Sequence, residues 1–351
     1  MKKFIALLLA LLMCTAVFAA CGKTAGESDT TAEVTDPVTD ESSSLPEKIV
    51  LSDDPVRVFT LKGPTGMGMA KLISDTDKGE ADLNYQFTVA SSADEFTGDI
   101  IQGNFEIAAV PTNLAAVLYA KTQGAVSVAA VNTLGVLYVL ENGDSIKSAE
   151  DLAGKTIYSS GQGAVPEYAL NYILDAYGIE CEVIYEAEHD AVVSDLVTGK
   201  ADIAILPEPK VTAALKNADA PKGLRVALDL NELWDEACAK KNDSGTLYMG
   251  CIIVNNTWAE GHKDELAAFL KEYEESVKLC SEDVDTAAQL IADAGIIPAA
   301  PVAKAAMANC HIVFITGDEM KNGLKGFYEV LYGFNPASVG GALPEDSFYL
   351  K

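Results

Sequence analysis

The amino-acid sequence predicts an α/β protein built from two βα lobes that are joined by two crossings of the chain. Two observations lead to this prediction. From about residue 51 onward, short apolar runs typical of buried strands alternate with amphipathic segments typical of helices. In addition, a strand–proline–helix unit at residues 103–117 returns at residues 199–211. The chain of 351 residues is long enough for two domains of ordinary size.

The first twenty residues have the pattern of an export signal. Two lysines follow Met1, and an apolar run over residues 4–17 is shorter than the roughly 20 residues that span a bilayer. The following Ala-Ala-Cys21 resembles the lipobox of bacterial lipoproteins, although Phe18 stands where an aliphatic residue is usual. The resemblance implies that residues 1–20 are removed and that Cys21 carries a lipid. A plain secretory signal that is cut near Ala20 is the alternative.

The next segment, residues 21–50, predicts a disordered acidic tether. It is rich in Thr, Ser, Asp and Glu and has almost no large apolar side chains, so it cannot bury a core. Such a tether would hold the folded part of the protein at a distance from the membrane into which the lipid inserts.

The charge of the chain narrows the classes of function. The formal net charge is −27, which repels phosphate backbones and argues against nucleic-acid binding. Only two arginines are present, Arg57 and Arg225, so bidentate recognition of an anion is limited.

The first half of the folded region begins with a strand, a glycine loop and a helix. A proline ends the third strand at Pro111, because proline cannot donate to a sheet, and Thr112 and Asn113 are common helix N-caps. The expected strands are 56–61, 85–90, 105–110 and 126–131, and the expected helices are 69–73, 94–102 and 114–121.

The second half repeats this order. Residues 87–113 align without a gap on residues 183–209 at a constant offset of 96, and the identical pairs include Gly103 with Gly199 and Pro111 with Pro207. The expected strands are 137–141, 156–160, 182–185 and 202–206, and the expected helices are 166–176, 188–198 and 211–215. A duplicated βα unit explains this agreement.

The rest of the chain returns to the first lobe. A strand is expected at 248–254, helices at 258–280, 284–294, 302–308 and 321–332, and a strand-like run at 312–315. The crossings are placed near residues 132–135 and 245–249. Lobe 1 is therefore expected to hold residues 51–133 and 250–351, and lobe 2 residues 134–249.

The strand–turn–helix ends point to ligand binding, since open α/β sheets bind ligands at the carboxyl ends of their strands. Their motifs, in order, resemble those of ABC-transporter substrate-binding proteins, in particular the group that binds nitrate, sulfonates, taurine and thiamine precursors. The motifs are Gly63-Pro-Thr-Gly-Met-Gly, Val110-Pro-Thr-Asn, Asp151-Leu-x-Gly-Lys, Gly161-Gln-Gly-Ala and Gly199-Lys-Ala-Asp-Ile-Ala. The resemblance implies the type II periplasmic-binding-protein fold.

The resemblance also implies a function and a site. The protein would capture a small molecule between its lobes and deliver it to an ABC permease with its ATPase. Its ligand-lining loops correspond to four places in this chain, with two tyrosines near the crossings as a floor. These residues are Pro64, Thr65, Gly66, Thr112, Asn113, Ser159, Ser160, Gly161, Gln162, Pro207 and Glu208, with Tyr138 and Tyr248.

The chemistry of the ligand stays open at this point. No arginine lies in these loops, so a sulfonate, nitrate or taurine-like anion would be held by backbone N–H groups, hydroxyls and helix N-termini. Glu208 would oppose an anion and favour an amine, and a pyrimidine-like ring stacked on tyrosine is a further alternative.

No catalytic pattern emerges from the sequence. His189, His262 and His311 are isolated, and no Ser-His-Asp order, paired carboxylates or metal spacing is present. We therefore expect no enzyme, cofactor or metal site, and a monomer. The alternatives are a solute sensor that docks on a membrane receptor and an enzyme of thiamine-precursor type. Five scattered cysteines after Cys21 are expected to be small buried side chains, and because five is odd they allow at most a partial set of disulfides, with one bridge as the alternative.

Overall fold

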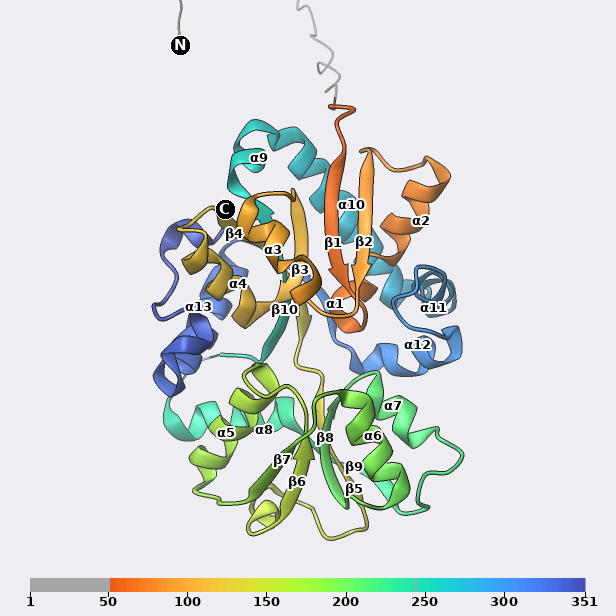
Figure 1. The fold of residues 1–351 in the computed structure, drawn as a ribbon, viewed down its shortest axis with the longest axis vertical. Helices are drawn as coiled ribbons and strands as arrows, with labels where there is room; N and C mark the ends of the chain where they lie inside the picture. The colour runs from red at the N-terminus through yellow and green to blue at the C-terminus, as the bar shows by residue number, and fades with distance from the viewer. Residues whose placement is uncertain (1–50, 244, 351) are drawn as a thin grey trace, which may run out of the picture. The chain divides into compact units, whose positions relative to one another are not determined.

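The computed structural model describes residues 51–243 and 245–350, and these residues form two β-sheets with helices around them (Figure 1). The α/β fold with two βα lobes is thereby confirmed. The proposed signal, Cys21 and the tether lie outside the described residues. Within the described ranges, no helix is both long and apolar enough to cross a membrane.

The first sheet has six strands in the order β11-β4-β10-β3-β1-β2. Strand β1 is parallel to β2 and β3, whereas β10 is antiparallel to β3 and β4. The strands are β1 (Val56–Leu61), β2 (Tyr85–Ala90), β3 (Ile107–Pro111), β4 (Val126–Leu134), β10 (Tyr248–Asn255) and β11 (Ile312–Ile315).

Helices cover both faces of this sheet because its strands are apolar on both faces. Along β3, Ile107 and Ala109 pack in one buried cluster, and Ala108 and Val110 pack in another, as the two-residue period of a strand requires. The helices of this lobe are α1 (Pro64–Met67), α2 (Ala70–Lys78), α3 (Asp94–Gln102), α4 (Thr112–Lys121), α9 (Asn256–Gly261), α10 (Lys263–Glu282), α11 (Val284–Asp293), α12 (Ala300–Ala306) and α13 (Gly317–Phe334).

The second sheet has five strands in the order β7-β6-β8-β5-β9. Strands β6, β7 and β8 are parallel, and β5 is antiparallel to β8 and β9. The elements are β5 (Leu137–Asn142), β6 (Thr156–Ser159), β7 (Glu182–Tyr185), β8 (Ile203–Pro207), β9 (Leu224–Asp229), α5 (Val165–Tyr177), α6 (His189–Thr198), α7 (Lys210–Leu215) and α8 (Leu230–Lys241).

The strand register brings the two proline-ended strands to the crossings between the sheets. Strand β4 ends at Leu134 and β5 begins at Leu137, so the chain passes between the sheets in two residues. Pro111 lies opposite Gly250, at the start of β10, and Pro207 lies opposite Leu137. The carboxyl ends of β3 and β8 therefore both lie beside the passage from one sheet to the other.

The repeat that the sequence predicts corresponds to matching elements. Strand β3 spans residues 107–111 and β8 spans 203–207, which reproduces the offset of 96. Gly103 and Gly199 end helices α3 and α6 in the left-handed conformation, with φ of 77° and 74°. This conformation costs glycine little, so the same residue ends the helix in both units.

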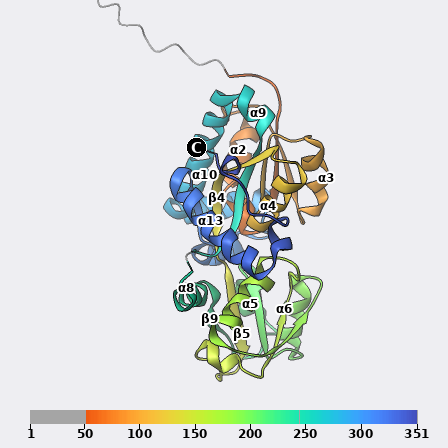
Figure 2. The ribbon, with the colours of Figure 1, turned by 90° about the vertical axis from the view of Figure 1, so that its left-hand side faces the viewer.

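The two lobes also share apolar contacts. Trp234 of α8 packs against Phe327 of α13 with ring centroids 5.8 Å apart, and Phe327 also meets Tyr248 at 6.0 Å. Figure 2 shows the side of the molecule on which α13 and α8 lie. One buried apolar cluster accordingly contains residues from both sheets, including Val110 and Val139.

Some predicted elements differ from the structure. Strand β9 and helix α8 were not predicted, and the helix expected over 258–280 is divided into α9 and α10 at His262, after Gly261. Helix α4 begins at Thr112, two residues before the predicted start, so neither Thr112 nor Asn113 caps it and the N-cap position belongs to Pro111. Four of the five cysteines match the prediction, since Cys238, Cys251, Cys280 and Cys310 are buried, whereas Cys181 is only half-buried; all five are free.

Candidate ligand-binding site

The candidate site is built from the strand ends that lie beside the crossings. On the first sheet, the loop after β1 carries Pro64, Thr65 and Gly66 as part of the short helix α1. Asn132 near the end of β4 holds this loop, because its side-chain amide donates to the Thr65 oxygen over 3.0 Å. Gly66 is buried so closely that a Cβ there would lie 1.9 Å from the Leu61 oxygen.

Thr112 and Tyr248 meet at the end of β3. The Thr112 hydroxyl is fully buried and donates to the main-chain oxygen of Tyr248 over 2.5 Å. The main-chain oxygen of Thr112 accepts from the hydroxyl of Tyr328 over 2.8 Å. Thr112 is thus committed to internal contacts in this structure.

Asn113, the next residue, is different. Its residue is 9% exposed, it lies in the first turn of α4, and its side-chain amide makes no hydrogen bond within residues 51–243 and 245–350. Asn113 is not among the described residues whose polar side-chain atoms are both sealed from solvent and unpaired, so its amide can be reached from the solvent and is free to donate to a ligand. Of the predicted residues on the first sheet, Asn113 is the one best suited to contact a ligand.

The second sheet contributes the loop after β6. Ser159 and Ser160 are buried, and the Ser159 hydroxyl donates to the Ser160 oxygen over 3.2 Å. The Ser160 hydroxyl is hydrogen-bonded to Nδ1 of His189, at the start of α6. Burial lowers the pKa of His189, and the nearby Lys210 lowers it further. Gly161 has φ +77°, and Gln162 is exposed.

Glu208 follows Pro207 at the end of β8, and its side chain is directed into the protein. It is 1% exposed. Its carboxylate accepts from the main-chain nitrogen and the hydroxyl of Thr212, over 3.0 and 2.9 Å, and from the Asn309 amide over 3.4 Å. Burial raises the pKa of Glu208, and these hydrogen bonds oppose the rise. Tyr138 donates to the main-chain oxygen of Asn309 over 3.3 Å.

Both arginines lie away from these strand ends. Arg57, near the start of β1, forms hydrogen bonds of 2.6 and 2.9 Å with Glu106. Arg225, near the start of β9, donates to Glu141 over 2.6 Å at the far end of β5. The site loops therefore contain no arginine and receive none from elsewhere in the described residues.

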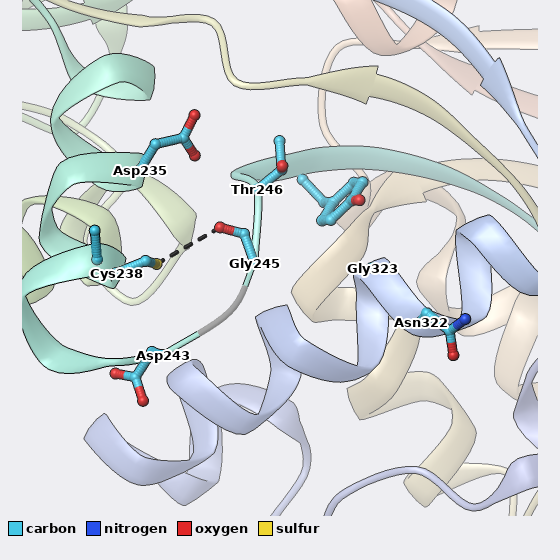
Figure 3. Close-up of a pocket in the computed structure, with 9 residues that line it drawn as sticks. Asp235, Cys238, Asp243, Gly245, Thr246, Asn322 and Gly323 are labelled. Atoms are coloured by element: carbon cyan, nitrogen blue, oxygen red, sulfur yellow. Dashed lines mark hydrogen bonds between the residues drawn. The ribbon is translucent and has the colours of Figure 1, made fainter.

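Two pockets include one predicted residue each. A pocket of about 440 Å³ at the second crossing is lined by Tyr248 together with Asp235, Cys238, Thr246 and Asn322 (Figure 3). In it, the Cys238 thiol lies 3.5 Å from the Gly245 oxygen. A second pocket of about 480 Å³ lies between α5 and the end of α13 and is lined by Gln162, Tyr168 and Phe334. The other predicted residues line neither pocket.

Six of the thirteen predicted residues fall into three contact groups. The first joins Thr112 to Tyr248, the second joins Ser160 to its neighbour Ser159, and the third joins Tyr138 to Glu208 through Asn309. Sequence reasoning missed Asn132 and Asn309 as residues that organise the site. Asn132 lies in a predicted crossing, and that position could have marked it as a site residue. Asn309 lies between a helix and a strand, and no local sequence pattern marks it.

Comparison with known proteins identifies the family of the chain. A sequence model of the family described as ABC transporter, phosphonate, periplasmic substrate-binding protein matches residues 78–305. The chain belongs to this family, and the predicted resemblance to ABC-transporter substrate-binding proteins is confirmed. Proteins of this family bind small molecules outside the cytoplasm and deliver them to ABC permeases. They are transport proteins rather than enzymes.

Solved structures support the fold. An ABC transporter protein from Parabacteroides distasonis is 22% identical, with a TM-score of 0.70 over 84% of this chain and 98% of the other. The periplasmic aliphatic sulphonate binding protein SsuA from Escherichia coli is 16% identical, with a TM-score of 0.66 over 86% and 93%. The alkanesulfonate-binding protein SsuA from Xanthomonas axonopodis pv. citri, bound to MOPS, is 12% identical, with a TM-score of 0.61 over 85% and 96%. No curated protein sequence matches the chain.

Proposed function

We propose that this protein captures a small oxyanion of the phosphonate or sulfonate class between its two lobes and delivers it to an ABC importer. The observation that carries the proposal is the side-chain amide of Asn113, which lies nearly buried at the start of α4 without a partner among the described residues. An amide N–H at a helix N-terminus suits an anion, because the helix dipole adds to its donor.

The surrounding groups favour the same class of ligand. Helices α5 and α6 begin after β6 and β7, on the same edge of the second sheet as Pro207, and add N-terminal dipoles from the other lobe. Ser160 adds a hydroxyl. Phosphonates and sulfonates can be held by such neutral donors, as backbone N–H groups hold oxyanions elsewhere.

Glu208 does not favour an amine in this arrangement. Both of its carboxylate oxygens already accept hydrogen bonds within the protein, and it is 1% exposed. An ammonium ligand would have to displace Thr212 or Asn309 to reach it. The anion that the sequence left as one alternative is therefore the better-supported ligand.

The wider assignment is part of the proposal. Lobe 1 would comprise residues 51–133 and 250–351, and lobe 2 residues 134–249. The thirteen residues predicted from the sequence would line or support the site. The chain would be exported, lipidated at Cys21 and held at the outer face of a cell membrane of Gram-positive type, as a monomer.

A ligand screen tests the proposal directly. Native mass spectrometry would identify a co-purified solute, and thermal-shift measurements would compare methylphosphonate, ethanesulfonate, taurine, nitrate, a pyrimidine and a simple amine. We expect the phosphonate or the sulfonate to raise the unfolding temperature most. Stabilisation by the amine or pyrimidine alone, or by none of these solutes, would contradict the proposal.

A substitution then tests the site. Asn113→Ala removes the free amide and is expected to weaken binding of the stabilising anion roughly tenfold or more, since a hydrogen bond to a charged group contributes about 1.5–3 kcal/mol. Asn217→Ala, in an exposed turn after α7, is the matched control and should leave affinity unchanged. If the two variants bind the anion with equal affinity, Asn113 does not contact the ligand.

A further inference from the structure

A segment of the first lobe reaches across the first crossing. Residues 307–311 connect α12 to β11, and β11 pairs with β4 in the first sheet. His311 lies beside the crossing: its main-chain oxygen accepts from the Leu134 nitrogen over 3.1 Å, and its Nδ1 lies 2.5 Å from the Gly135 oxygen. We call residues 307–311 the strap.

Asn309 of the strap contacts the second lobe at two points. Its main-chain oxygen accepts from the Tyr138 hydroxyl over 3.3 Å, and its side-chain amide donates to Glu208 Oε1 over 3.4 Å. Tyr138 lies on β5 and Glu208 directly follows β8, and these are neighbouring strands of the second sheet. Helix α12 also packs against α7, the helix that follows Glu208.

The Glu208 carboxylate acts only as an acceptor in its contacts with α7 and the strap. All three of its partners, the Thr212 nitrogen, the Thr212 hydroxyl and the Asn309 amide, act as donors. An acceptor with two oxygens satisfies all of them, whereas a glutamine would turn an N–H₂ group toward one of them. The contact is therefore directional, unlike the apolar contact between Trp234 and Phe327.

We propose that Asn309 is a positioning residue that sets how far the two lobes open, by tying the strap of lobe 1 to Glu208 and Tyr138 of lobe 2. This inference rests on the proposed two-lobe binding function and deepens it. In this proposal Glu208 helps to hold the two lobes together and does not contact the ligand. A ligand that needs both lobes would bind best when the strap holds them at one angle.

Three variants of the folded, full-length protein test the strap without any ligand. Asn309→Asp places two carboxylates together, Asn309→Ala removes the side-chain contact, and the double variant Asn309→Asp with Glu208→Gln restores one donor facing one acceptor. Small-angle X-ray scattering of the ligand-free proteins should give a larger radius of gyration for each single variant and a value near wild type for the double variant. Asn256→Asp is the control, since Asn256 donates to Gly124 within lobe 1.

Binding provides a second readout. Each single variant should lose at least about threefold in affinity for methylphosphonate or ethanesulfonate, whichever the wild type binds, and the double variant should recover most of the loss. Tyr138→Phe keeps the carboxylate contact, removes one hydroxyl and should open the lobes to a smaller extent. It also tests the strap if the double variant fails to fold.

The outcomes separate the two proposals. A radius of gyration equal to wild type in Asn309→Asp, or a double variant that is as open as the single variants, would overturn the strap even if anions bind. A wild type that binds neither anion would overturn the proposed ligand class, while opening of the single variants and recovery in the double variant would still support the strap.

Discussion

The Thr112 hydroxyl and the Tyr248 main-chain oxygen lie 2.5 Å apart, and this hydrogen bond joins the end of β3 to the start of β10 beside the second crossing. Both residues are buried. The bond therefore holds one proposed ligand loop against the passage between the lobes.

Thr112→Val removes this hydroxyl while keeping the shape of the side chain. The Tyr248 oxygen then loses its donor in a buried place, and we expect the free energy of unfolding to fall by about 1–3 kcal/mol. Urea denaturation measures the loss. Thr198→Val, whose hydroxyl bonds to the Ser194 oxygen at an exposed site, should change stability far less. Equal losses of stability in both variants would show that the Thr112–Tyr248 hydrogen bond contributes no more to stability than an exposed one.

Gly66→Ala tests the close packing of the loop after β1. The new Cβ would lie 1.9 Å from the Leu61 oxygen, so the loop must move. We expect a loss of stability of about 1–3 kcal/mol or more and weaker ligand binding. Gly98→Ala, inside α3 with open space around its Cβ position, should be neutral or stabilising by about 0.5–1 kcal/mol. A harmless Gly66→Ala would mean that the loop adapts freely.

His189 makes stability depend on pH. Its pKa is lowered by burial, so the unfolded chain binds a proton more readily than the folded one. Stability should therefore fall as the pH drops below about 6.5, the ordinary value for histidine, and through the lower pKa of the folded state. Unfolding temperatures from pH 5 to pH 7 measure this trend. His189→Gln should flatten it, and an unchanged trend in that variant would contradict the prediction.

The cysteines should differ in reactivity. Burial raises the pKa of Cys280 to about 11 and raises that of Cys251 further, whereas Cys181 is only half-buried. Among the described cysteines, iodoacetamide should modify Cys181 first in the folded protein at pH 8, because the thiolate must be exposed to react. Peptide mass spectrometry locates the label. Labelling of Cys251 at the same rate before urea is added would contradict this order.

Much of the fold could be predicted because its signals are local. The apolar run over residues 182–185 and the glycine and proline that end each repeated unit predicted β7, α6 and β8 closely. Helix α8 had a readable signal as well, since its buried Leu230, Leu233, Trp234, Ala237 and Cys238 follow the spacing of one helical face. The sequence of strand β9 shows little alternation between apolar and polar residues, because β9 is a half-buried strand at the edge of its sheet.

The candidate site was harder to predict because its contacts are distant in sequence. Thr112 is a residue type common at helix N-caps, but its hydroxyl donates to the main-chain oxygen of Tyr248, which is 136 residues away. Glu208 has the chemistry of an exposed charge at a rim, but Asn309, 101 residues away, helps to bury it. Local propensity predicted where the loops lie, whereas tertiary contacts decide which side chains of those loops stay available.

The pairing of Arg57 with Glu106 and of Arg225 with Glu141 has a consequence for how the protein would meet an anion in solution. Salt weakens anion binding at a site that contains arginine, because it screens the attraction between the two charges. This site has neutral donors in a chain of net charge −27, so salt mainly screens the long-range repulsion between the chain and an anion. Raising the ionic strength would then speed the association of an anion instead of slowing it. Such a receptor is suited to collecting anions from a saline medium.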